Sequence, residues 1–202
     1  MIRVLVVDDH QLLIDGIRST LRNEKSISIV GEAHNGEEVL EQLEAMNAEV
    51  DVILMDIYMP VMNGMDCTRE VCKQYPHIKV IGLSQYDERR FIKKMIKYGS
   101  TGYLLKDATK SEIIKAIQDV HEGKEYFTPR VSEKLIRGSS GDNHTDSMFP
   151  KLTGREKEIL KLICEGLSSH EISSKLTISY HTVESHRANL MVKTDAKNTA
   201  EL

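Results

Sequence analysis

The stretch DVILMDIYMP, residues 51–60, runs from an apolar segment directly into an acidic side chain. Residues 52–55 form a continuous aliphatic run, which is typical of a strand buried on both faces of a sheet. Asp56 follows without a turn residue, and a carboxylate at the mouth of a buried strand is costly unless something pairs with it or uses it. The stretch therefore predicts a parallel sheet with a functional carboxylate at one strand end.

Residues 1–125 alternate short apolar runs with amphipathic stretches five times. The apolar runs predict strands, and apolar residues recurring at i, i+4 and i+8 predict helices. The predicted strands are 3–8, 27–33, 51–56, 79–84 and 101–106, and the predicted helices are 11–22, 36–46, 65–74, 88–98 and 111–122. This alternation predicts an α/β fold, a doubly wound parallel five-stranded sheet with helices on both faces.

The pattern changes after residue 125. Residues 126–150 are predicted to hold one short helix, 131–136, and then a flexible linker, GSSGDNHTDSMFP, at 138–150. Helical periodicity returns in residues 151–202 without strand candidates. We therefore expect a second, small all-α domain there.

Composition and charge favour a cytoplasmic protein without a membrane anchor. The net charge of −4 argues against a strongly basic nucleic-acid binder, although residues 151–202, with 8 Lys and Arg against 7 Asp and Glu, are less acidic than residues 1–130, with 17 against 21. The three cysteines form no C-x-x-C pair, which favours a reducing compartment. No apolar run approaches the roughly 18–20 residues of a membrane span.

Polar groups stand at the ends of four predicted strands: Asp8 and Asp9, Asp56, Ser84, and Lys106. In a doubly wound sheet, ligands bind beyond the carboxyl ends of the strands. Three carboxylates there repel one another, and a hard divalent cation, most naturally Mg²⁺, would keep them ionised. The lysine and serine supply donors for a phosphoryl group, so we expect Asp56 to be the nucleophile that accepts phosphate. The alternative is that the aspartates are helix caps or solvated strand ends.

The segments VLVVDDH (4–10), MDIYMPVMNG (55–64) and GYLLKDA (102–108), with Ser84, resemble the receiver domain of bacterial two-component response regulators over residues 2–125. The resemblance implies a flavodoxin-like fold with strand order 2-1-3-4-5 and phosphorylation of Asp56 by a sensor histidine kinase. It also implies the roles of the surrounding residues: Mg²⁺ held by Asp9, Asp56, the backbone carbonyl of Tyr58 and, through water, Asp8; phosphoryl oxygens bound by Ser84 and Lys106; and Tyr103 as the rotating aromatic that reports phosphorylation.

A phosphatase of the haloacid-dehalogenase type is the rival interpretation, because it also uses an aspartyl nucleophile just after a strand. That chemistry needs a second aspartate two residues further on, and Tyr58 occupies that position. The glycine-rich phosphate-binding motifs are absent from the sequence. We therefore expect a protein that is not an enzyme.

Residues 152–193 predict three helices. Thr153 and Glu156 have the spacing of a capping box, Ser168 or Ser169 caps the second helix, and Ser179 caps a third helix over 180–193. Two short helices joined by a tight turn predict a helix-turn-helix, whose second helix enters the DNA major groove. Val183 and Leu190 should face the core. The candidate DNA contacts are His181, Thr182, Glu184, Ser185, Arg187, Ala188 and Lys193.

Residues 152–202 resemble the LuxR-type DNA-binding domain of the NarL/FixJ class of regulators, through LTGREKEILKLICEGLSSHEIS, TVESHRANLMVK and KNTAEL. The combination implies a transcription regulator whose partners are a histidine kinase, double-stranded DNA and, when phosphorylated, a second copy of the chain. Glu184 departs from the lysine of many relatives, and a carboxylate repels phosphate. A helical dimerisation or docking module that binds no DNA stays open as the alternative, because the net charge of residues 151–202 is only +1.

The chain stops soon after a further helix signal. Asn198-Thr199 has the pattern of a helix cap, but three residues follow, less than one turn of about 3.6 residues. We expect the domain to be cut short relative to its relatives by roughly two to three turns. Its core near Leu162, Leu190 and Leu202 should then be partly exposed.

Overall fold

The computed structural model describes residues 1–85, 87–137, 152–194 and 196. The chain divides into two compact units, Met1–Gly141 and Asp142–Leu202, which are treated separately below. None of the described helices is long and apolar enough to span a bilayer. The predicted linker at 138–150 and the cap at Asn198-Thr199 lie outside the described residues.

The first unit is built on a parallel sheet with the order β2-β1-β3-β4-β5-β6. The strands are β1 Ile2–Val7, β2 Ile27–Ala33, β3 Val52–Asp56, β4 Lys79–Ser84, β5 Gly102–Leu105 and β6 Tyr126–Phe127. The predicted order of the first five is confirmed, but the prediction of a five-stranded sheet is wrong. The sixth strand has only two residues, which is too short to show an apolar pattern in the sequence.

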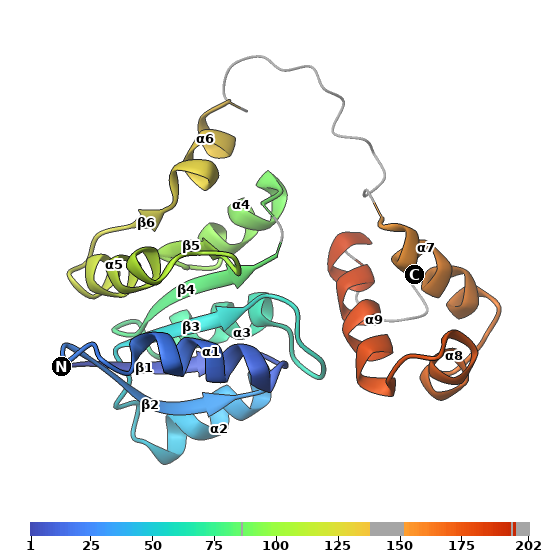
Figure 1. Cartoon of the computed structure of the whole chain (residues 1–202), viewed down its shortest axis with the longest axis horizontal. Helices are drawn as coiled ribbons and strands as arrows, with labels where there is room; N and C mark the ends of the chain where they lie inside the picture. The colour runs from blue at the N-terminus through green and yellow to red at the C-terminus, as the bar shows by residue number, and fades with distance from the viewer. Residues whose placement is uncertain (86, 138–151, 195, 197–202) are drawn as a thin grey trace. The chain divides into compact units, whose positions relative to one another are not determined.

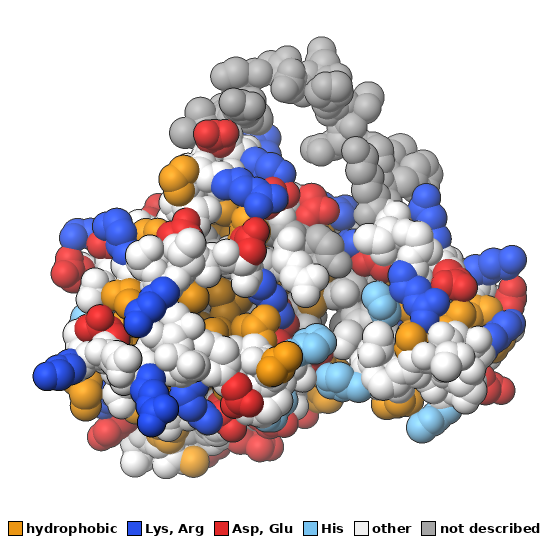
Figure 2. Space-filling view, viewed as in Figure 1, with side chains coloured by type: hydrophobic (Ala, Val, Ile, Leu, Met, Phe, Trp, Pro, Cys, Tyr) orange, Lys and Arg blue, Asp and Glu red, His pale blue; other side chains and the backbone are white. Residues whose placement is uncertain are grey.

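Six helices connect and flank these strands: α1 Gln11–Leu21, α2 Gly36–Ala45, α3 Gly64–Gln74, α4 Arg89–Lys97, α5 Lys110–His121 and α6 Pro129–Arg137. Helices α1 and α5 lie together on one face of the sheet, and α2, α3 and α4 lie on the other (Figure 1). On the face shown in Figure 2, hydrophobic side chains are visible between α1 and α5. The arrangement confirms the doubly wound architecture.

Burial of the strands explains why they read as continuous apolar runs. Every residue of β3 is buried, and Val4 to Val7 of β1 are fully inaccessible. Helices on both faces exclude water from both sets of side chains, so no alternation with polar residues is needed. Short polar signals fix the helix starts: the Asn35 side chain accepts hydrogen bonds from the backbone of Glu37 and Glu38, which caps α2.

The second unit contains α7 Gly154–Cys164, α8 Ser169–Leu176 and α9 Tyr180–Thr194. The predicted capping box between Thr153 and Glu156 is present, and Ser168 forms a second one with Glu171. Thr182 N donates to Ser179 Oγ at 3.0 Å, as expected for a cap of α9.

The core of the second unit is formed by Ile159, Leu162, Ile172, Val183 and Leu190. Val183 and Leu190 are fully buried, which confirms that they face inward. The expectation of an exposed core is wrong for Leu162, which is 6% exposed, and for Leu190, which is fully buried in the same cluster. Leu202 lies outside the described residues.

Candidate functional site

Four predicted site residues meet at one edge of the sheet in the first unit. Asp56 and Ser84 are the last residues of β3 and β4, and Asp8 and Lys106 follow β1 and β5 directly. The strands are parallel and adjacent, so their carboxyl ends bring these side chains together. Asp8 and Ser84 are fully buried, and Asp56 is 2% exposed.

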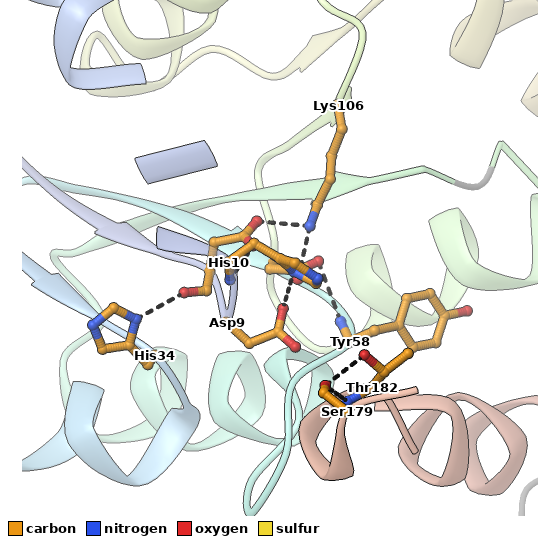
Figure 3. Close-up of polar contacts among 9 residues, drawn as sticks. Asp9, His10, His34, Tyr58, Lys106, Ser179 and Thr182 are labelled. Carbon is orange, nitrogen blue, oxygen red and sulfur yellow. Dashed lines mark hydrogen bonds and ion pairs between the residues drawn. The ribbon is translucent and has the colours of Figure 1, made fainter. Parts of the chain in front are cut away.

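The ammonium group of Lys106 holds two of the carboxylates (Figure 3). Its Nζ lies 2.6 Å from Asp8 Oδ2 and 2.8 Å from Asp56 Oδ2. Burial on its own would lower the pKa of Lys106, but the charges of Asp56 and Asp8 raise it above its ordinary value. The protonated form of Lys106 is therefore favoured, and its positive charge lies directly against the candidate nucleophile.

The surroundings of Asp56 make its ionised form dependent on cations. Burial raises the pKa of the Asp56 carboxyl; Lys106 opposes this rise, and the charges of Asp8 and Asp9 add to it. The backbone N–H of Tyr58 donates to Asp56 Oδ1 at 3.3 Å. The site is also tightly enclosed, because a Cβ on Gly64 would lie 1.8 Å from the backbone oxygen of Asp56.

Asp8, Asp9 and His10 form a group whose ligand atoms lie within 4.8 Å of one another. His10 Nδ1 is 2.7 Å from Asp9 Oδ1 and 3.4 Å from Asp8 Oδ1. The imidazole of His34 contacts the backbone oxygen of Asp8 at 3.2 Å (Figure 3). The carboxylate oxygens of Asp8 and Asp9 are the ligand type that Mg²⁺ prefers, so the donor set fits this ion.

Neither histidine was among the predicted site residues. His10 could have been found in the sequence, because it follows the aspartate pair directly. His34 lies just beyond β2, the strand next to β1, and no local signal marks it as a neighbour of Asp8.

Ser84 and Tyr103 lie together in the interior on neighbouring strands. Both side chains are fully buried, and the Ser84 hydroxyl acts on the pKa of the Tyr103 phenol. Burial raises the pKa of Tyr103 well above its ordinary value, and the Ser84 hydroxyl only partly offsets this rise. Tyr103 is therefore a neutral phenol on the strand next to the one that carries the candidate phosphoryl-binding hydroxyl.

Helix α9 of the second unit carries the candidate DNA contacts. His181 is exposed, and Glu184, Ser185 and Arg187 are partly exposed. Thr182 is half-buried, and its hydroxyl lies 2.7 Å from Ser179 Oγ at the start of the helix (Figure 3). The side chain of Ala188 is outside the described part of the chain.

The burial of Lys193 contradicts its predicted role as a DNA contact. Its Nζ lies 2.6 Å from Glu156 Oε1 and 2.7 Å from Glu156 Oε2, and both side chains are 1% exposed. A buried ammonium that neutralises a buried carboxylate is not available to DNA phosphates. Lys193 joins the end of α9 to the start of α7, and no local pattern could predict this pair because the two residues are 37 positions apart.

Two protein families match the chain. Residues 4–118 match the response regulator receiver domain, and residues 150–202 match the bacterial regulatory proteins of the luxR family. The response regulator UvrY of Escherichia coli O6:H1 is 36% identical over 202 residues, which cover 100% of this chain and 92% of UvrY. The transcriptional regulatory protein DegU of Brevibacillus brevis is 34% identical, covering 99% of this chain and 90% of DegU.

Solved structures agree with these sequence matches. The crystal structure of the response regulator ChrA, from a heme-sensing two-component system, is 32% identical, with a TM-score of 0.58 over 98% of this chain and 92% of ChrA. The similarity thus spans both units of the chain.

Proposed function

The chain belongs to the bacterial two-component response regulators that combine a receiver domain with a LuxR-type DNA-binding domain, and we propose that phosphorylation of Asp56 by a sensor histidine kinase switches it. The observation that carries this proposal is the position of Asp56. Its carboxylate is buried at a strand end and in contact with the charged Lys106.

In the proposed reaction, a carboxylate oxygen of Asp56 attacks the phosphorus of a phosphohistidine on the kinase. The bond between phosphorus and the imidazole nitrogen breaks, and an acyl phosphate forms. Lys106, which already lies 2.8 Å from Asp56, then pairs with a phosphoryl oxygen, and the Ser84 hydroxyl donates a hydrogen bond to another. These donors stabilise the added charge in a site from which water is largely excluded.

We propose that Mg²⁺ assists at this site, held by Asp9, Asp56 and the backbone carbonyl of Tyr58, and by Asp8 through water. When bound, the ion would neutralise charge on the carboxylates and on the phosphoryl oxygens. The oxygen donors of Asp8 and Asp9 beside the buried Asp56 support this assignment. Asp8 also keeps Lys106 in place through its own ion pair.

Tyr103 is proposed to report the reaction. When the Ser84 hydroxyl turns toward the phosphoryl group, its interaction with the Tyr103 phenol must change, because a hydroxyl donates one hydrogen at a time. Through this change at Tyr103, phosphorylation would alter the surface near β5 and α4.

For the second unit we propose that the outer face of α9 contacts double-stranded DNA. His181, Glu184, Ser185, Arg187 and Ala188 are the proposed base contacts, and Thr182 and Arg187 the proposed phosphate contacts. We also propose that phosphorylation favours a homodimer, since two linked DNA-binding units gain affinity through effective concentration. The proposed DNA target implies a cytoplasmic location.

DNA binding with and without the phosphate mimic beryllofluoride tests this proposal. Gel-shift titration of the full chain on selected duplex DNA should show tighter binding when Mg²⁺ and beryllofluoride are present. The Asp56→Asn variant should bind DNA with the basal affinity under both conditions. A full chain without measurable DNA binding at low salt would favour a regulator that acts through protein partners, since phosphate contacts are strongest there.

A further inference from the structure

Helix α6 packs against the receiver unit. Val131 on α6 is fully buried, and its N–H donates to the hydroxyl of Thr128, which is itself 5% exposed. Helices α4 and α6 are in contact, and Figure 1 shows α6 next to α4 at the edge of the sheet where β5 and β6 lie. The helix that leads out of the receiver is therefore part of its folded surface.

One carboxylate ties α6 to the loop after β4. Arg130 Nε and Nη2 lie 2.9 Å and 2.8 Å from Asp87 Oδ2, and Lys134 Nζ lies 2.5 Å from Asp87 Oδ1. Burial alone would raise the pKa of Asp87, but the bonds from Lys134 and Arg130 lower it below its ordinary value. We call Asp87, Arg130 and Lys134 the α6 clamp; Figure 2 shows acidic and basic side chains beside one another at α6.

The clamp lies next to the phosphoryl-binding residues. Asp87 is three positions after Ser84, and Arg130 Nη1 also lies 3.5 Å from Oδ2 of Asp107, the residue after Lys106. A pocket of about 300 Å³ is lined by Ser84, Gln85, Leu105, Lys106, Asp107 and Arg130. Arg130 thus contacts both loops that carry the groups proposed to bind phosphate.

We propose that the α6 clamp holds α6 on the receiver while Asp56 is unphosphorylated, and that phosphorylation opens it. The proposal rests on the proposed function, because it takes Asp56 as the phosphate acceptor. Ser84 must turn toward the phosphoryl group, and the loop that follows it moves with it. Asp87 is then drawn away from Arg130 and Lys134, and α6 is released together with the chain that leads to the DNA-binding unit.

Phosphorylation of Asp56 and opening of the α6 clamp should be thermodynamically linked, and this linkage can be measured. If phosphorylation favours the open clamp, then opening the clamp must favour phosphorylation by the same factor, because coupling free energies are reciprocal. Substitutions that break the clamp should therefore strengthen the binding of a phosphate mimic at Asp56, although neither Asp87 nor Lys134 lines the pocket.

Calorimetric titration of the full chain with beryllofluoride in the presence of Mg²⁺ provides the test. Asp87→Asn, and separately Lys134→Gln, should raise the affinity for beryllofluoride by about fivefold or more, the low end of common allosteric coupling. Amide hydrogen exchange of residues 129–137 should become faster in these variants, and in the wild type on addition of beryllofluoride.

Asp119→Asn is the matched control. Asp119 on α5 pairs with two lysines, Lys115 Nζ at 2.9 Å and Lys124 Nζ at 3.9 Å, and its side chain is 20% exposed against 18% for Asp87. The Asp119→Asn substitution removes the same charge as Asp87→Asn. It does so in a similar ion-pair network that includes neither of the loops that follow β4 and β5. We expect its affinity for beryllofluoride to equal that of the wild type.

An unchanged or weaker affinity in Asp87→Asn, with Asp119→Asn behaving as the wild type, would overturn the clamp. Equal strengthening in both variants would also overturn it, because net charge alone would then explain the effect. The proposed function fails separately: in that case Asp56→Asn would bind beryllofluoride as tightly as the wild type, whatever the clamp variants do.

Discussion

At the scale of single residues, Val61 stands out because its backbone is in the left-handed region, with φ of 67°, although its side chain is β-branched. This conformation costs a non-glycine residue roughly 1–2 kcal/mol. The side chain is 75% exposed, so its packing contributes little in return. Val61 lies in the loop between Asp56 and α3, where strain is often retained near a functional site.

Val61→Asn should therefore stabilise the receiver unit by about 1 kcal/mol, because asparagine tolerates the left-handed region. The thermal unfolding of the receiver transition measures the effect. Val61→Ala, which removes the branch but keeps the conformation unfavourable, should gain less. A lower melting temperature for Val61→Asn would show that the valine side chain makes a stabilising contact.

The buried pair of Glu156 and Lys193 predicts how the second unit responds to acid. Burial alone would raise the pKa of Glu156, but the hydrogen bonds from Lys193 and the backbone of Thr153 lower it below its ordinary value of 4.5. A lowered pKa in the folded state means that the stabilisation is complete above that ordinary value and is lost as the pH falls below it. The melting temperature of this unit should decline in that window.

Glu156→Gln isolates the ion pair, because glutamine can keep the capping box with Thr153. It removes the carboxylate charge that neutralises the buried Lys193 ammonium, which should destabilise the unit by about 3–5 kcal/mol. Combining it with Lys193→Met should restore most of the stability. Urea unfolding of the three proteins provides the comparison, and a neutral effect of Glu156→Gln alone would contradict the assigned pair.

At the scale of helices and strands, α9 makes a prediction about DNA. Arg187→Ala should weaken binding to duplex DNA and reduce the slope of log affinity against log salt by about one. The matched control is Lys157→Ala, which removes the same charge from an exposed position on α7. Equal slopes for both variants in anisotropy titrations would show that Arg187 makes no phosphate contact.

Elements that bury a continuous surface were predictable, and those that depend on distant partners were not. The five long strands could be read from their apolar runs, and Asp8, Asp56, Ser84 and Lys106 could be grouped because parallel strands align their ends. Strand β6 exists because two residues pair with Gly102 and Tyr103. The ion pairs of Asp87 with α6 join residues 43 and 47 positions apart, and no local pattern encodes them.

At the scale of the whole molecule, the described residues of the two units form separate cores. The second unit should therefore fold without the first. A fragment of residues 148–202 should bind DNA without a phosphate mimic, though weakly, because it lacks the receiver-driven dimer. Gel-shift at low salt tests this, and a folded fragment that does not bind would favour the docking-module alternative.

The proposed switch depends on one covalent event, the formation of an acyl phosphate on Asp56. Incubation with Mg²⁺ and acetyl phosphate, followed by intact-mass analysis and peptide mapping, measures it directly. The wild type should gain one phosphoryl group on the peptide that contains Asp56, in a base-labile bond, and Asp56→Asn should gain none. Lys106→Ala should retain some phosphorylation without tighter DNA binding. Phosphate uptake by Asp56→Asn in the same type of bond would contradict the assignment of the site.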